Sequence, residues 1–79
     1  MLIPIDRLRS GESGEVREIT GGRGMVQRLE TMGVRPGKVL VKVSAVFMGG
    51  PVTVMVDGRE MAMGRGIARR VFVEKRQAK

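Results

Sequence analysis

The stretch RLETMGVRPGKVLVKV (residues 28–43) carries the clearest structural signals in this sequence of 79 residues. It completes an apolar stripe in which Met25, Leu29 and Met32 recur at spacings of four and three, as they would on one face of a short helix. Gly33 stands where a helix can end in the left-handed conformation that glycine adopts without penalty. The sequence therefore predicts a helix that stops at Gly33 and buries this stripe.

The residues after Gly33 predict a tight turn followed by a strand. Pro36 disfavours helical geometry at the residue before it, and Pro36 and Gly37 suit the two central positions of a type II turn. From residue 38 the sequence alternates in the manner of a strand, which places Lys42 on the same face as Leu40 and opposite Val41. The chain is thus expected to turn sharply from the helix into a sheet.

Short units between glycines predict the other strands. Residues 14–20 are rich in branched side chains, and a break in their alternation between Val16 and Ile19 predicts a bulge. MGGP (residues 48–51) is typical of a hairpin loop, and the strand after it would turn Val52, Val54 and Val56 inward. DG (residues 57–58) predicts a second hairpin, from which REMAM (residues 59–63) returns as a strand.

The last part of the chain predicts one turn and one strand. GRGIA (residues 64–68) is too short for a regular helix and suits a single 3₁₀ turn. RRVFVE (residues 69–74) would then place Val71 and Val73 on one face. This order predicts a mainly β fold: an SH3-like, five-stranded barrel with one short helix inserted after the first strand. One domain is expected over residues 1–79, with residues 75–79 as a flexible basic tail.

The net charge of +7 is the strongest compositional signal, with 15 Lys and Arg against 8 Asp and Glu. These charges are scattered along the chain, a distribution typical of a solvated surface, although nucleic acid and an anionic membrane face are alternative partners. No signal peptide and no membrane-spanning run is expected. Because Trp and Tyr are absent, the aromatic platforms used by proline-peptide and single-stranded nucleic acid binders are missing.

The chain has no His and no Cys, which removes the commonest general base and the preferred soft metal ligands. Neither a catalytic site, a metal site nor a cofactor is therefore predicted. Seven methionines are present. Gap-filling in the core is the expected role of Met25 and Met32, while methionines near the hairpins could form an exposed protein-binding patch.

Three segments together resemble the FeoA family of ferrous iron transport proteins: GESGEVREITGG (residues 11–22), RLETMGVRPG (residues 28–37) and GGPVTVMVDGREMAMGRGIARRVFV (residues 49–73). The resemblance implies an SH3-like barrel with an inserted helix. It also implies a non-catalytic, cytoplasmic accessory protein, peripheral at the inner face of the membrane, that binds an FeoB-type GTPase-permease and regulates or assembles it. Two alternatives stay open, a basic barrel that binds nucleic acid non-specifically and a stand-alone repressor-type SH3-like module.

The family pattern falls mostly on positions that we interpret as structural: Gly21, Gly22, Leu29, Met32, Gly33, Pro36, Gly37, Gly50, Pro51, Gly58 and Ala68. Arg28 is a charged residue within the pattern, and a salt bridge or a cap inside the domain is its alternative role. The outward helix face and the basic residues of the turn are expected to bind the partner: Gln27, Arg28, Arg35 and Lys38.

Overall fold

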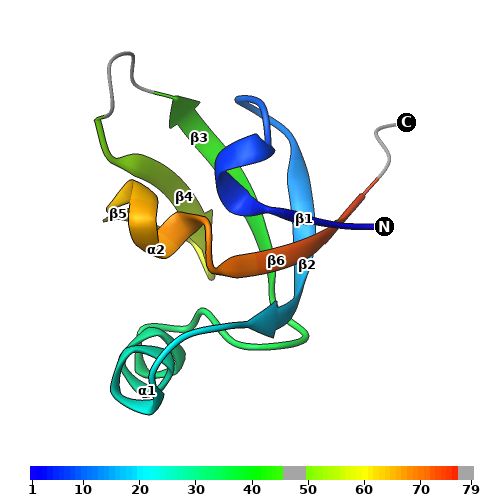
Figure 1. Cartoon of the computed structure of the whole chain (residues 1–79). Helices are drawn as coiled ribbons and strands as arrows, with labels where there is room; N and C mark the ends of the chain where they lie inside the picture. Colours follow the sequence, from blue (N-terminus) through cyan, green and yellow to red (C-terminus); the bar gives the residue numbers. More distant parts are fainter. Residues whose placement is uncertain (46–49, 77–79) are drawn as a thin grey trace.

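The computed structural model describes residues 1–45 and 50–76, in which six antiparallel strands form one strongly bent sheet (Figure 1). The strands follow the order β1-β6-β2-β3-β4-β5 across the sheet. Their bounds are β1 (Leu2–Pro4), β2 (Ser13–Ile19), β3 (Val39–Ala45), β4 (Val52–Val56), β5 (Arg59–Met63) and β6 (Val71–Lys75). Three short helical segments complete the fold: η1 (Ile5–Arg7), α1 (Arg23–Thr31) and α2 (Arg65–Ala68). The predicted mainly β, SH3-like fold with a helix after residues 14–20 is confirmed.

The number of strands and the closure of the sheet were predicted wrongly. The extra strand is β1, which pairs with β6 through Ile3 opposite Val73, and among the described residues β1 and β5 form the two edges of an unclosed sheet. Three residues ending in Pro4 are too few to show a strand period. The segment is held by tertiary packing instead, since Ile5 and Leu8 just after it are buried at 0% and 3% exposure.

The turn before the last strand also differs from the expected 3₁₀ turn. The Ala68 N–H donates to the Gly64 carbonyl at 2.9 Å, an α-helical bond, although Ile67 N–H also donates to that oxygen at 3.1 Å. Ala68 is completely buried. We attribute the wider α-helical register to this burial, because in this register the small Ala68 side chain packs into the core.

The other predicted turns that fall on described residues are confirmed. The pairing of β2 with β6 shifts between Val16 and Glu18, which is the expected bulge. β4 and β5 are joined by Asp57 and Gly58 with φ of 53° and 77°, the conformation of a type I′ hairpin. The MGGP loop lies largely outside the described residues, which resume at Gly50.

The core is filled mainly by valines, among them the three alternate valines of β4 and the predicted pair Val71 and Val73. On β3 the inward face carries Leu40 and Lys42, so that Val39 and Val41 are each 38% exposed on the outer face. Within the described residues, no helix is long and apolar enough to cross a membrane.

Met32 does not belong to the core, contrary to the prediction. The side chain of Met32 is 47% exposed, whereas Leu29 is buried and Met25 is partly buried against the core. The physical reason is the helix end, where Met32 is already the C-terminal cap and the chain reverses at the next residue. Val34 folds back instead and is completely buried.

Candidate functional site

The junction (residues 28–38) contains the end of α1 and the turn into β3. The Gly33 N–H donates to the Glu30 carbonyl at 3.0 Å, and the Val34 N–H donates to the Leu29 carbonyl at 2.9 Å. With Gly33 at φ +99°, these two bonds form a Schellman motif. Such motifs often include an apolar contact between the two residues that the longer bond joins, which are Leu29 and Val34 in this protein. The predicted helix stop at Gly33 is confirmed.

The turn of the junction is fixed to the sheet. The Lys38 N–H donates to the Arg35 carbonyl at 3.1 Å, and Gly37 has φ +97°, as a type II turn requires. β2 holds this turn through Val16, which accepts from Gly37 N–H and donates to the Lys38 carbonyl, both at 2.8 Å. Backbone bonds at both ends make the junction a rigid element.

The residues expected to bind a partner surround this element, and three of them are exposed: Gln27, Arg28 and Arg35. Among the described residues, neither arginine forms an ion pair, so the alternative internal salt bridge of Arg28 is not found there. Its backbone carbonyl, not its side chain, accepts from the Met32 N–H at 3.2 Å. Both arginine charges are available to a partner.

Lys38, the fourth expected residue, is engaged within the domain. Its Nζ lies 3.1 Å from both carboxylate oxygens of Asp57, at the tip of the β4–β5 hairpin. The two side chains are 41% and 54% exposed, so water screens the pair. Lys38 therefore ties the junction to the hairpin, while Arg28 and Arg35 supply its free positive charge.

Met32 adds an apolar centre that the sequence did not predict for this surface. It follows Arg28 by four residues, which places the two side chains on one face of the helix end. A partly exposed methionine flanked by arginines has the composition of a protein-contact surface, since apolar centres and arginine are both enriched there.

The remaining positions of the family pattern lie at boundaries of elements or in the core. Gly22 caps the start of α1, and Gly50 and Pro51 come directly before β4. Gly21 has φ +127°, a conformation that side chains rarely adopt. These positions shape the backbone that carries the junction and offer no reactive group.

Lys42 is a charged residue in the core, with a side chain that is only 1% exposed. The sequence did not predict a functional or structural role for it. Its Nζ donates to the Leu8 carbonyl at 2.6 Å and to the Ile5 carbonyl at 3.5 Å. Burial lowers the pKa of the Lys42 ammonium below its ordinary value, an effect that the carboxylates of Asp6 and Glu12 partly oppose. The side chain anchors the N-terminal segment to β3. In the sequence, the one sign of an inward position was that Lys42 lies on the same strand face as Leu40.

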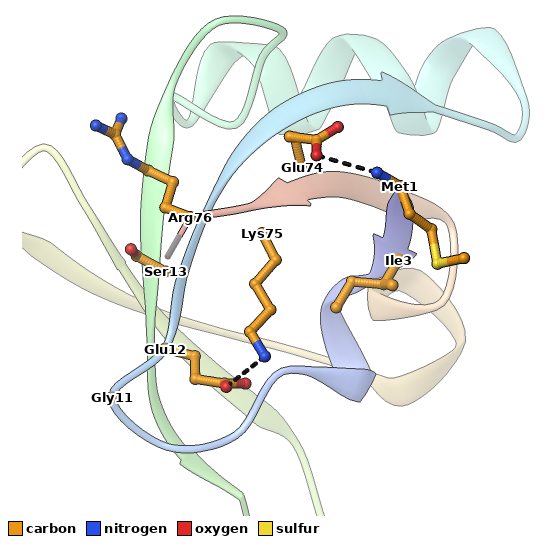
Figure 2. A pocket seen from close by; sticks show the side chains of 8 residues that line it. All are labelled: Met1, Ile3, Gly11, Glu12, Ser13, Glu74, Lys75 and Arg76. Carbon is orange, nitrogen blue, oxygen red and sulfur yellow. Dashed lines mark hydrogen bonds and ion pairs between the residues drawn. The ribbon is translucent and has the colours of Figure 1, made fainter. Parts of the chain in front are cut away.

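A concavity of about 530 Å³ lies where the N-terminus meets the end of β6 (Figure 2). Four of its five charged groups pair with one another: the N-terminal ammonium of Met1 lies 3.0 Å from Glu74, and Lys75 Nζ lies 2.7 Å from Glu12, while the fifth is Arg76. The hydrogen bond from Lys75, and then that from the Arg9 N–H, lowers the pKa of the Glu12 carboxyl. The described residues contain no group of three or more potential metal ligands. We find no arrangement for catalysis in this concavity.

These features define a small SH3-like domain whose most distinctive surface is a rigid helix–turn junction. The sequence profile of the FeoA domain family matches residues 3–75. A Methanocaldococcus jannaschii protein named Fe(2+) transport protein A is 34% identical over 73 residues, covering 92% of this chain and 87% of that protein. The chain belongs to the FeoA family, whose members are accessory proteins of ferrous iron transport.

Solved structures agree with this assignment. The crystal structure of an iron uptake regulatory protein, FeoA, superposes with a TM-score of 0.87 at 36% identity, over 95% of this chain and 99% of that one. A manganese-dependent transcriptional repressor superposes with a TM-score of 0.85 at 19% identity, over 94% of this chain and 41% of the repressor. The likeness to the repressor shows a shared fold only.

Proposed function

We propose that this chain is a non-catalytic accessory protein that binds an FeoB-type GTPase-permease for Fe(II) and regulates or assembles it. Family membership supports the class of partner. The observation that carries the mode of binding is the rigid junction, which exposes Met32 together with Arg28 and Arg35, two arginines that form no ion pair within the described part of the chain. A pre-formed surface loses little conformational entropy on binding. The chain would act in the cytoplasm, peripheral to the inner face of the membrane.

The composition of the junction predicts how binding responds to conditions. Burial of Met32 would supply apolar contact, while the arginines would steer the approach of an acidic surface. Rim charges mainly raise the association rate and are screened by salt. Binding should therefore weaken as ionic strength rises, mostly through slower association.

Titration calorimetry tests this proposal against both the GTPase domain and the intact permease in nanodiscs. Arg28→Ala and Arg35→Glu should each weaken binding, and Met32→Ser should weaken it further. Arg76→Ala, which removes an exposed arginine at the far end of β6, is the matched control and should bind like the unaltered protein. Folded junction variants that bind normally would place the interface elsewhere, and no binding by the unaltered chain would remove the docking mechanism.

No resident metal or cofactor belongs to this proposal. Carboxylates and thioethers alone hold Fe(II) poorly, and the sequence contains no His or Cys. Purified protein should carry no stoichiometric iron or zinc after dialysis. One firmly bound metal ion per chain by elemental analysis would contradict this part of the proposal.

The net charge of +7 supports one second candidate, a non-specific nucleic acid binder. Without Trp or Tyr side chains for base stacking, only electrostatic attraction to the phosphate backbone is expected to contribute to binding. This contribution weakens with salt and gives dissociation constants of about 10⁻⁴–10⁻⁶ M. Sequence-selective, submicromolar binding to DNA or RNA at physiological salt would favour this function over the accessory role.

A further inference from the structure

A second basic surface lies around α2, away from the junction. Arg65 begins α2 and Arg69 is its C-terminal cap with helical backbone angles, so these two arginines, four residues apart, share one face of the single turn. Arg69 Nε lies 3.9 Å from Asp6 Oδ2 on η1, which brings α2 and η1 together as Figure 1 shows. Arg7, the residue after Asp6 in η1, is exposed.

The same surface continues to the start of α1. The Arg70 carbonyl accepts from the Thr20 N–H at 2.8 Å, and the Cδ of Arg70 lies 3.4 Å from where a Cβ of Gly21 would be. Arg70 therefore lies against the chain that leads into Arg23, the first residue of α1. We define the α2 arginine surface by the arginines that these contacts bring together: Arg7, Arg23, Arg65, Arg69 and Arg70.

The charge of this surface is almost uncompensated. All five arginines are exposed, and among the described residues only Arg69 forms an ion pair, a long one with Asp6. Arginine is less strongly hydrated than lysine and matches phosphate oxygens with two parallel donors. A surface built from arginine alone is therefore suited to phosphate groups.

The spread of the five arginines over η1, the α2 region and the start of α1 favours contacts with several phosphate groups over a single enclosed ligand. The concavity of Figure 2 is lined by other residues, so these arginines do not belong to it. α2 has four residues, too few to lie along a nucleic acid groove, and the chain has no Trp or Tyr for base stacking. We propose that the α2 arginine surface binds the headgroups of an anionic phospholipid bilayer.

This inference rests on the proposed function, because it gives the accessory protein a second attachment at the permease's membrane. α1 runs from the α2 arginine surface to the junction, and its nine residues span about 13 Å. Arg23 of the α2 arginine surface begins this helix, and the junction starts in its last turn. Membrane and permease can therefore be bound at the same time, with α1 as the spacer between them.

Vesicle sedimentation of the full chain tests the proposal, with phosphatidylcholine vesicles compared with vesicles containing about 30% phosphatidylglycerol. The triple variant Arg7→Gln, Arg65→Gln, Arg70→Gln is compared with a control of equal net charge, Arg28→Gln, Arg35→Gln, Arg76→Gln. Each basic residue near an anionic surface contributes about fivefold in partitioning, so the first triple should bind about a hundredfold more weakly. The control should stay within a few-fold of the unaltered chain.

Three results would overturn the proposal. Equal loss in both triples would show that net charge, not this surface, determines binding. An unaltered chain that prefers neither vesicle would show that no lipid attachment exists. Tighter binding to mixed-sequence duplex DNA than to anionic vesicles would reassign the surface to nucleic acid. Because the first triple leaves the junction intact, its binding to the GTPase domain should be unchanged, which separates this test from that of the proposed function.

Discussion

Lys38 lies directly before β3 and Lys42 lies inside it, four residues further on, and the structure uses them in opposite ways. Lys38 is 41% exposed and meets the carboxylate of Asp57 at 3.1 Å. Lys42 is 1% exposed and meets no carboxylate within ion-pair distance among the described residues, only backbone carbonyls of Leu8 and Ile5. Lys38, which has a carboxylate counter-ion, is at the surface, where water screens the pair. Lys42, which has none within the described residues, is in the core.

The difference shows that burial, more than the presence of an opposite charge, determines what a lysine contributes here. An exposed pair gains little because water already solvates both groups. A buried ammonium must keep all of its hydrogen bonds, since the loss of either partner leaves a desolvated polar group. The N-terminal segment therefore depends on Lys42 far more than the hairpin depends on Lys38.

The largest expected effect is that of Lys42→Ala. The change removes the donor to the Leu8 carbonyl and leaves a cavity among core residues, which together should lower the free energy of unfolding by about 3–5 kcal/mol. A domain of this size has only a few kcal/mol of stability, so the variant should be largely unfolded at room temperature. Urea unfolding followed by circular dichroism measures this.

Lys42→Met is the matched control, because it fills the same space without a charge. Isolated carbonyls are tolerated better than isolated donors, so this variant should fold and lose no more than about 2 kcal/mol. If Lys42→Ala were as stable as the unaltered protein, the anchoring role of Lys42 would be wrong.

The pH dependence of stability sharpens the same comparison. Burial holds the pKa of Lys42 below its unfolded value of 10.5, so the unfolded chain binds more protons between the two values. Stability relative to Lys42→Met should therefore rise as pH increases through that window, by at most about 1.4 kcal/mol per pH unit. Urea unfolding of both proteins from pH 7 to 10.5 tests the sign, and a difference that falls with pH would contradict it.

Gly33→Ala, at the junction, should have an intermediate effect of about 1 kcal/mol or more. The residue has φ +99°, where a Cβ is strained, although the space itself is adequate at 3.4 Å from the Asp57 carboxylate. Gly24→Ala is the control, since that helical position is open and should be neutral or stabilising. Thermal melts that show equal changes in both variants would mean that the Schellman motif does not hold the helix end.

The smallest effect is expected for the Lys38–Asp57 pair. A double-mutant cycle with Lys38→Gln and Asp57→Asn should give a coupling of about 0.5 kcal/mol or less, declining with added salt. Asn is chosen because Asp57 has φ 53°, which Asn tolerates. A coupling above about 1 kcal/mol that persists in high salt would contradict this prediction. It would show that the exposed Lys38 contributes to stability in a way that is closer to the buried Lys42 than its exposure indicates.

The sequence by itself determined the features that local chemistry controls. Glycine at positive φ and proline at a turn act within a few residues, so the helix stop at Gly33, the type II turn at Pro36 and Gly37, and the Asp57–Gly58 hairpin could all be predicted. The period-two valines of β4 predicted their burial for the same reason. The arginines of the junction were predicted as partner-binding residues because they lie within this local pattern, and that role stays a prediction.

Only the tertiary structure decided the features that depend on distant segments. β1 exists because residues about 70 positions away pair with it, and Met32 is exposed because Val34 occupies the core position beside Leu29. Gly14 is needed because its Cβ would lie 2.6 Å from the Val73 side chain, a contact that no local pattern encodes. Lys42 lies in the core because the carbonyls of the N-terminal segment, more than thirty residues away, come within reach of its ammonium. Hydrogen-bond partners for a buried charge are a property of the assembled fold, and the sequence of one strand does not contain them.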